Sequence, residues 1–125
     1  MHTLLATLIS FALLAQSAGG AGRVVTLVLP RDLTADEAVA VEVKVGVIAR
    51  GAQIKVETTS GKLLGVISPY GLRSGDEAGT YPIRVPSEAI SNRRVSLRIT
   101  LSYNRSKRAP TAQEVRSVQL KITSR

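Results

Sequence analysis

Residues with the chemistry for nucleophilic catalysis or tight metal binding are scarce in this sequence. It contains no cysteine, and its single histidine, His2, lies at the start of the first apolar segment. Catalytic triads, Cys–His pairs and most zinc or copper sites depend on an imidazole or a thiol. We therefore expect a protein that is not an enzyme and that binds no metal or other cofactor.

Carboxylates are the other candidates for acid–base or metal chemistry, and two adjacent pairs stand out, Asp36-Glu37 and Asp76-Glu77. Neither pair belongs to the D-x-D-x-D-G pattern with which a loop offers calcium several oxygen ligands. Adjacent side chains of an extended chain often point to opposite sides, which keeps the two carboxylates of a pair apart. We interpret both pairs as solvated loop residues, and an enzyme with a carboxylate mechanism ranks third among our functional hypotheses.

Basic side chains provide the strongest functional lead. The net charge is +8, and residues 81–125, with ten basic and two acidic residues, account for all of it. Arginine and lysine bind phosphate, sulfate and carboxylate groups, and arginine does so with two parallel hydrogen bonds. The alternative is a solvated face that keeps the protein soluble or blocks edge-to-edge strand pairing. The residues that we predict to form an anion- or partner-binding site are Arg94, Arg98, Arg105, Lys107 and Arg108.

The sequence disfavours nucleic acid as the partner of these cations. Basic charge alone gives salt-sensitive, non-specific binding, and proteins that bind single strands also use aromatic side chains on which the bases stack. Beyond the first apolar segment the only aromatic residues are three tyrosines, and we expect two of them, Tyr81 and Tyr103, to face inward.

Two of the predicted site residues belong to a segment with a strict period of two, residues 93–103. Side chains of a strand alternate between its faces, so the apolar residues share one face and the polar residues share the other. We predict a central antiparallel strand with one face on a core and one in water. The apolar set is Val95, Leu97, Ile99, Leu101 and Tyr103, and the polar set is Arg94, Ser96, Arg98, Thr100 and Ser102.

Six further segments read as strands because they are rich in β-branched residues or alternate in the same way. The clearest of them places five valines at alternate positions, the last being Val47. Residues 86–92 have room for one helical turn with Ser87 as its cap, and residues 104–112 form a basic loop. The six predicted strands cover residues 23–29, 38–47, 52–58, 63–68, 80–85 and 113–122.

Three single residues refine these strands. Pro82 cannot donate a hydrogen bond to a ladder, which predicts an edge position for its strand. Gly65 indicates a bulge or a close approach of the backbone to a neighbour. Val115 is out of phase with the rest of its segment, which predicts a bulge near Arg116-Ser117.

Seven short strands in slightly more than one hundred residues predict one domain with one modest core. Two apolar faces must meet, so the simplest closure is a sandwich of two sheets. This is the size of an immunoglobulin-like or fibronectin-type sandwich, although the chain has neither the cysteines nor the tryptophan of immunoglobulin domains. We predict an all-β, immunoglobulin-like sandwich over residues 23–125, with a small open barrel as the alternative.

The first twenty-two residues carry no Asp, Glu, Lys or Arg. An apolar run over residues 4–15, followed by small and polar residues, is typical of a secretory signal peptide, and the run is too short to span a membrane. The basic residues usual before such a run are missing here. We predict that residues 1–22 are a signal peptide with an open cleavage site, and that the protein is exported to the periplasm or the exterior.

The first functional hypothesis is therefore an exported, non-catalytic binding module with a basic C-terminal face. Its partner would be acidic: an envelope protein, a polysaccharide or a lipid head group. The second hypothesis is a structural subunit of a cell-surface or envelope assembly that is joined through strand edges.

Overall fold

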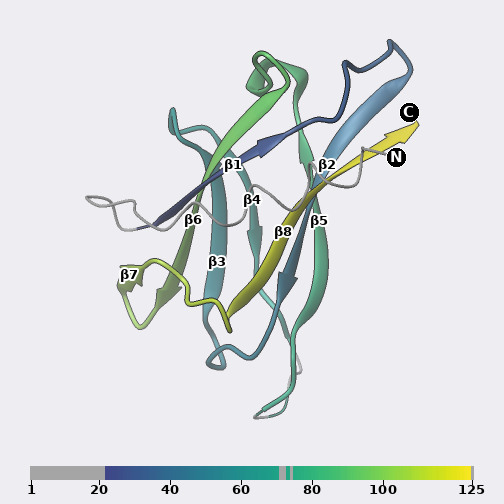
Figure 1. Cartoon of the computed structure of the whole chain (residues 1–125). Helices are drawn as coiled ribbons and strands as arrows, with labels where there is room; N and C mark the ends of the chain where they lie inside the picture. Colours follow the sequence, from purple (N-terminus) through teal and green to yellow (C-terminus); the bar gives the residue numbers. More distant parts are fainter. Residues whose placement is uncertain (1–21, 71–72, 74, 125) are drawn as a thin grey trace.

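The computed structural model describes residues 22–70, 73 and 75–124. The predicted signal peptide, residues 1–22, lies outside the described residues except for Gly22. All seven predicted strands are present, and an eighth short strand lies within the predicted basic loop (Figure 1). The elements are β1 (Arg23–Val28), β2 (Glu37–Val45), β3 (Gln53–Thr58), β4 (Leu63–Ile67), β5 (Gly79–Val85), the 3-10 helix η2 (Ser87–Ala89), β6 (Arg94–Tyr103), β7 (Ser106–Arg108) and β8 (Val115–Ser124).

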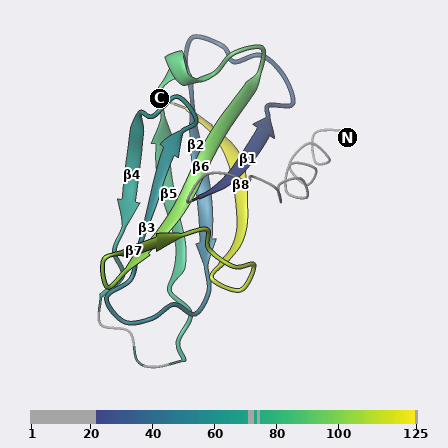
Figure 2. The ribbon, with the colours of Figure 1, turned by 90° about the vertical axis from the view of Figure 1, so that its left-hand side faces the viewer.

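The strands form two antiparallel sheets. The first has the order β1-β6-β3-β4, with β7 paired to the end of β6, and the second has the order β5-β2-β8. The chain passes from one sheet to the other at most of its connections, so apart from the pairs β3–β4 and β6–β7, strands that are neighbours in a sheet are not consecutive in sequence (Figures 1 and 2). The protein is therefore all-β, in an arrangement consistent with a β-sandwich.

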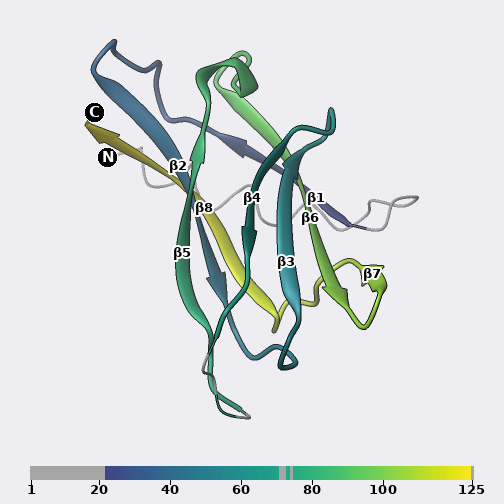
Figure 3. The ribbon, with the colours of Figure 1, turned by 180° about the vertical axis from the view of Figure 1, so that it is seen from behind.

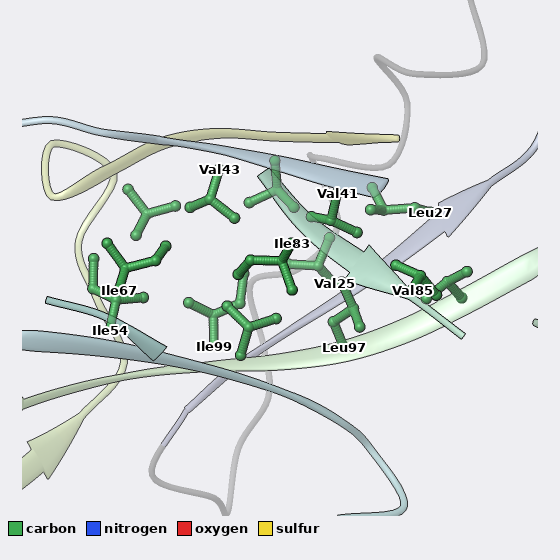
Figure 4. Packing of buried hydrophobic residues seen from close by; sticks show 14 of the residues in the cluster. Val25, Leu27, Val41, Val43, Ile54, Ile67, Ile83, Val85, Leu97 and Ile99 are labelled. Atoms are coloured by element: carbon green, nitrogen blue, oxygen red, sulfur yellow. The ribbon is translucent and has the colours of Figure 1, made fainter. Parts of the chain in front are cut away.

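One aliphatic core lies between the two sheets (Figure 4). Val41 and Val43 of β2 face Ile54 of β3 and Ile99 of β6, and all four side chains are fully buried. The alternating pattern produces this core directly, because every second side chain of each strand points to the opposite sheet. Without cysteines, the folded state depends on this buried apolar area and on the hydrogen bonds of the sheets.

The prediction of a central strand is confirmed, because β6 lies between β1 and β3. Its apolar residues from Val95 to Leu101 are buried. The buried apolar side ends at Leu101. Tyr103 is 40% exposed, so the prediction that it faces inward is wrong. The opposite face is not uniformly wet, because Thr100 is only 3% exposed.

Both bulge predictions are confirmed. In the pairing of β2 with β8, Lys44 is opposite Ser117 and Val45 is opposite Val115, so Arg116 is the extra residue. In the pairing of β3 with β4, the register shifts beside Gly65. A side chain at Gly65 would also lie 3.3 Å from Ile83 of the other sheet, so the close approach is present as well.

Of three other local predictions, one is confirmed and two are wrong in part. Pro82 lies in β5, which is an edge strand as predicted. The helical turn is present as η2, but Pro86 is its N-cap and no side chain caps it, so the role given to Ser87 is wrong. Val47 was expected to face inward; it lies beyond the end of β2 and is 44% exposed, because the strand pairing ends at Val45.

The predicted basic loop folds into a hairpin formed by β6 and β7. The two residues at its tip, Asn104 and Arg105, have φ values of 51° and 69°. A two-residue hairpin turn with both residues at positive φ matches the twist of the strands, and asparagine tolerates this conformation well. Asn92 and Arg93, at the other end of β6, form a similar pair with φ values of 54° and 63°.

The core makes a direct prediction for stability. Ile99→Ala should lower the free energy of unfolding by about 2–5 kcal/mol, because it removes a fully buried side chain and leaves a cavity. Val47→Ala, at an exposed position, should change it by no more than about 0.5 kcal/mol. Urea unfolding followed by circular dichroism measures both. Equal effects of the two substitutions would contradict this description of the core.

Candidate anion-binding face

The strand register brings three cations to the outer face of the first sheet. Residues directly opposite each other in an antiparallel pair share a face. Lys55 of β3 is opposite Thr100, and Lys107 of β7 is opposite Ser102, and both of these β6 residues lie on the same face as Arg98. We call Lys55, Arg98 and Lys107 the cationic face. Arg105 extends it at the tip of the β6–β7 hairpin (Figure 3).

Among the described residues, Arg98, Arg105 and Lys107 have no carboxylate within ion-pair distance, and Lys55 has only Glu57, at 3.9 Å. Arg105 and Lys107 are exposed, whereas Arg98 is half-buried. The Nε atom of Arg98 is enclosed and has no hydrogen-bond partner within the described part of the chain. Gly22 passes close over this part of the sheet, since a Cβ there would lie 2.6 Å from the Arg98 side chain.

Arg94 does not join the hairpin cations, although it was predicted to belong to the same site. It lies at the start of β6, about 30 Å from Tyr103 at the rise of an extended strand. Arg98 lies between the two ends, about 13 Å from Arg94. The predicted cluster is therefore a line of separated charges along one strand, with its denser end at the β6–β7 hairpin.

Arg108 is already occupied within the protein. Its two terminal nitrogens donate to the two carboxylate oxygens of Glu114, at 2.6 and 2.7 Å. This bidentate pair lowers the pKa of Glu114 to about 2, with the hydrogen bond from Arg108 as the main cause. Arg108 thus supports the connection from β7 to β8, and its charge is largely matched.

The same arrangement occurs a second time. Arg31 donates to both oxygens of Glu37, at 2.7 Å each, and the backbone N–H of Thr34 donates to Glu37 Oε1. In the second copy, Thr111 takes the place of Thr34 beside Glu114. We call this unit the Arg–Thr–Glu clasp. Both copies read R-x-x-T-A-x-E, over residues 31–37 and 108–114.

The clasps lead into β2 and β8, which are neighbours in the second sheet. Each lies where the chain passes from the first sheet to the second. The repeat of seven residues is visible in the sequence and identifies these two ion pairs. The predicted site residues did not take it into account. Glu37, interpreted as a solvated loop residue, is instead held by a clasp.

The charge that is concentrated in residues 81–125 is not concentrated on one face. Arg84 lies on β5, and Arg116 and Lys121 lie on β8, all in the second sheet. Arg116 pairs with Glu77 at 2.7 Å, and Lys121 pairs with Glu42 at 3.5 Å. Segments that are close in sequence belong to different sheets, so these three cations do not lie on the cationic face. Lys55, which does lie there, comes from the part of the chain before residue 81, where basic and acidic residues balance.

The carboxylates of the second acidic pair each contact a group within the protein. Glu77 contacts Arg116, and Asp76 Oδ2 accepts a hydrogen bond from the backbone N–H of Arg73. Within residues 22–70, 73 and 75–124, no group of three or more His, Cys, Asp or Glu side chains is arranged to hold a metal ion.

A hollow of about 880 Å³ lies at one end of the two sheets, between the β2–β3 and β4–β5 connections. Val47 and Tyr70 give it exposed apolar walls, and Arg50 gives it a cation. Figure 3 shows the two connections at the end of the molecule where β3 begins and β4 ends. The hollow therefore adjoins the end of β4 and the start of β3.

No protein-family model matches this chain, and comparison with curated proteins and with solved structures also gives no significant match. The part of the chain that the structure describes contains no helix of the length and hydropathy needed to cross a membrane. The cationic face and the strand edges are the features from which a function can be inferred.

The clasp at Glu114 predicts a pH dependence of stability. Because the folded-state pKa of Glu114 is about 2 and its ordinary value is 4.5, the stabilisation is complete above about pH 5 and is lost as the pH falls toward 2. Glu114→Gln should therefore lower the free energy of unfolding at pH 7, and the difference from the wild type should shrink between pH 5 and 2.

Urea unfolding at several pH values measures this difference. The double variant Arg108→Gln/Glu114→Gln should lose little more stability than either single variant, because both remove the same ion pair. A wild-type advantage over Glu114→Gln that stays constant down to pH 2 would contradict the assignment.

Proposed function

We propose that this protein is an exported, non-catalytic binding module that attaches to an acidic macromolecule through the cationic face. The observation that supports this most is that Lys55, Arg98 and Lys107, from three different strands, share one outer face, on which Glu57 lies opposite Arg98. Candidate partners are an acidic envelope protein, a polysaccharide or a lipid head group. Carboxylate, sulfate and phosphate groups all suit such a face.

The conformation of Arg105 adds support. An L-residue other than glycine or asparagine at a φ of 69° costs about 1–2 kcal/mol relative to an ordinary conformation. Glycine is the residue that this turn position favours. An arginine in this strained conformation suggests that its side chain contributes something other than stability, and an exposed cation near Lys107 fits a binding role.

The finer fold assignment that we propose is an immunoglobulin-like sandwich with its first and last strands exchanged. In immunoglobulin domains, strands A, B and E are neighbours in one sheet, and C, F and G are neighbours in the other. The orders β8-β2-β5 and β4-β3-β6-β1 match A-B-E and C′-C-F-G. On this assignment β1 takes the place of the last strand G, and β8 takes the place of the first strand A.

Retention on a sulfated dextran column tests the proposal. Arg105→Gln/Lys107→Gln should weaken binding at about 0.1 M salt by roughly five- to tenfold, since each exposed ion pair contributes up to about 1 kcal/mol. The matched control is Lys44→Gln/Arg84→Gln, which removes the same charge from exposed positions of the second sheet. Equal loss in both variants would show that only net charge matters, and would overturn the proposed face.

A structural subunit that is joined through strand edges is the second candidate. The position of β1 favours it: β1 is an edge strand that pairs only with β6, yet it buries Val25 and Leu27 in the core. A terminal strand of this kind can be exchanged between copies while keeping the same contacts.

Thr26 and Ser96 provide a test, because they are opposite each other and their hydroxyl oxygens are 3.4 Å apart. Thr26→Cys/Ser96→Cys should form a disulfide, since the native chain has no competing cysteine. If copies exchange β1, oxidation during assembly should link two chains. Disulfides exclusively within single chains, read on a non-reducing gel, would count against the second candidate.

A further inference from the structure

The five strands with a free edge, β1, β4, β5, β7 and β8, are not equally protected against pairing with another strand. In the second sheet, β5 contains Pro82, and β8 carries the charged side chains of Arg116 and Lys121. In the first sheet, Arg23 of β1 donates to the backbone carbonyl of Pro110 at 2.9 Å, and β7 carries Lys107 and Arg108. Proline, bulges and charged side chains are the usual means by which a sheet edge resists further pairing.

β4 has less of this protection along its free edge. Its sequence, LLGVI, contains no proline and no charged residue, and its bulge lies on the side of its partner β3. Leu63 and Val66 are 54% and 48% exposed, and Tyr70, just beyond the strand, is 88% exposed. Three of the five exposed large apolar side chains in the described part of the chain therefore lie in residues 63–70.

We propose that β4 is a docking strand, and that its occupant is an extended segment of an acidic partner protein that adds to the first sheet as a new strand. In this mode the free backbone N–H and C=O groups of β4 supply hydrogen bonds, and alternate side chains of the added strand supply specificity. The inference rests on the proposed function, because it names the protein class among the acidic partners considered above.

The two faces of the added strand would meet different surroundings. On the inner side, Gly65 of β4 lies near Ile83 of the other sheet and Ile67 is buried, so apolar side chains would extend the core. On the outer side, Val66 is opposite Lys55, which belongs to the cationic face. A segment that alternates apolar and acidic residues would satisfy both sides.

The surroundings of β4 favour an acidic partner over a second copy of this chain. Beyond the end of β4, the hollow described above offers Val47 and Tyr70 to apolar groups and Arg50 to a carboxylate. Arg50 has no carboxylate within ion-pair distance among the residues of the described structure. Two copies that pair through β4 would bring together two chains with a net charge of +8 each, and their outer cations would repel.

The test uses a fluorescent, capped peptide of about ten residues in which valine alternates with glutamate, and it measures binding by fluorescence anisotropy. The wild-type protein should bind it. Val66→Lys should weaken binding at least about tenfold, although the new charge attracts the peptide, because a lysine on the strand opposes strand addition. A peptide with N-methyl groups on alternate amides should also lose binding, since it cannot complete the ladder.

Tyr103→Lys is the matched control, because Tyr103 is an exposed apolar residue away from β4 and gains the same charge. It should bind the peptide within about twofold of the wild type. A wild-type protein that does not bind the peptide, or a Val66→Lys variant that binds as well as Tyr103→Lys, would overturn the proposal. So would a wild-type dimer in sedimentation that Val66→Lys dissociates, because the occupant would then be a second copy.

The two proposals can fail separately. Arg105→Gln/Lys107→Gln tests the sulfated dextran interaction at the hairpin, whereas Val66→Lys tests the edge of β4. If dextran retention depends on Arg105 and Lys107 but the peptide does not bind, the cationic face stands and the docking strand falls.

Discussion

Burial of aliphatic side chains between two sheets is the constraint on which the rest of this structure depends. The core consists of valine, leucine, isoleucine and alanine, and it contains no aromatic ring among the fully buried residues that the structure describes. With no disulfide to hold the sheets together, each strand must present an uninterrupted apolar face. The opposite face of a strand is then free to carry charge, so β6 contributes one face to the core and carries Arg94 and Arg98 on the other.

The connections between the sheets are the second determinant of the architecture. Each passage between sheets exposes backbone that has no ladder partner, and the Arg–Thr–Glu clasp satisfies part of it by hydrogen-bonding a backbone N–H. The two clasps enter neighbouring strands of the same sheet. Arg31 and Arg108 therefore act within the fold, and the charge left for a partner is smaller than the net charge of the chain indicates.

Two features of the first sheet are available to a partner: the cations on its outer face and the free edge of β4. The first sheet presents Lys55, Arg98 and Lys107 on its outer face, and the same sheet ends at β4, whose free edge is apolar. An acidic chain could use both features at once, since Lys55 lies in the row that includes Val66. The second sheet has a proline in one edge strand, charged side chains in the other and several of its charges in ion pairs, so it offers less.

Local sequence patterns determined the seven main strands, the central position of β6, the edge position of Pro82 and the bulge at Arg116, because alternation and proline geometry depend only on neighbouring residues. Tertiary structure decided which cations share a face, because strand register and sheet membership join residues that are far apart in sequence. It places Arg94 far from the β6–β7 hairpin, pairs Arg108 with Glu114, leaves Tyr103 exposed and brings Lys55 onto the same face as Arg98. Each of these outcomes depends on a partner strand, a carboxylate or a strand end that no local pattern specifies.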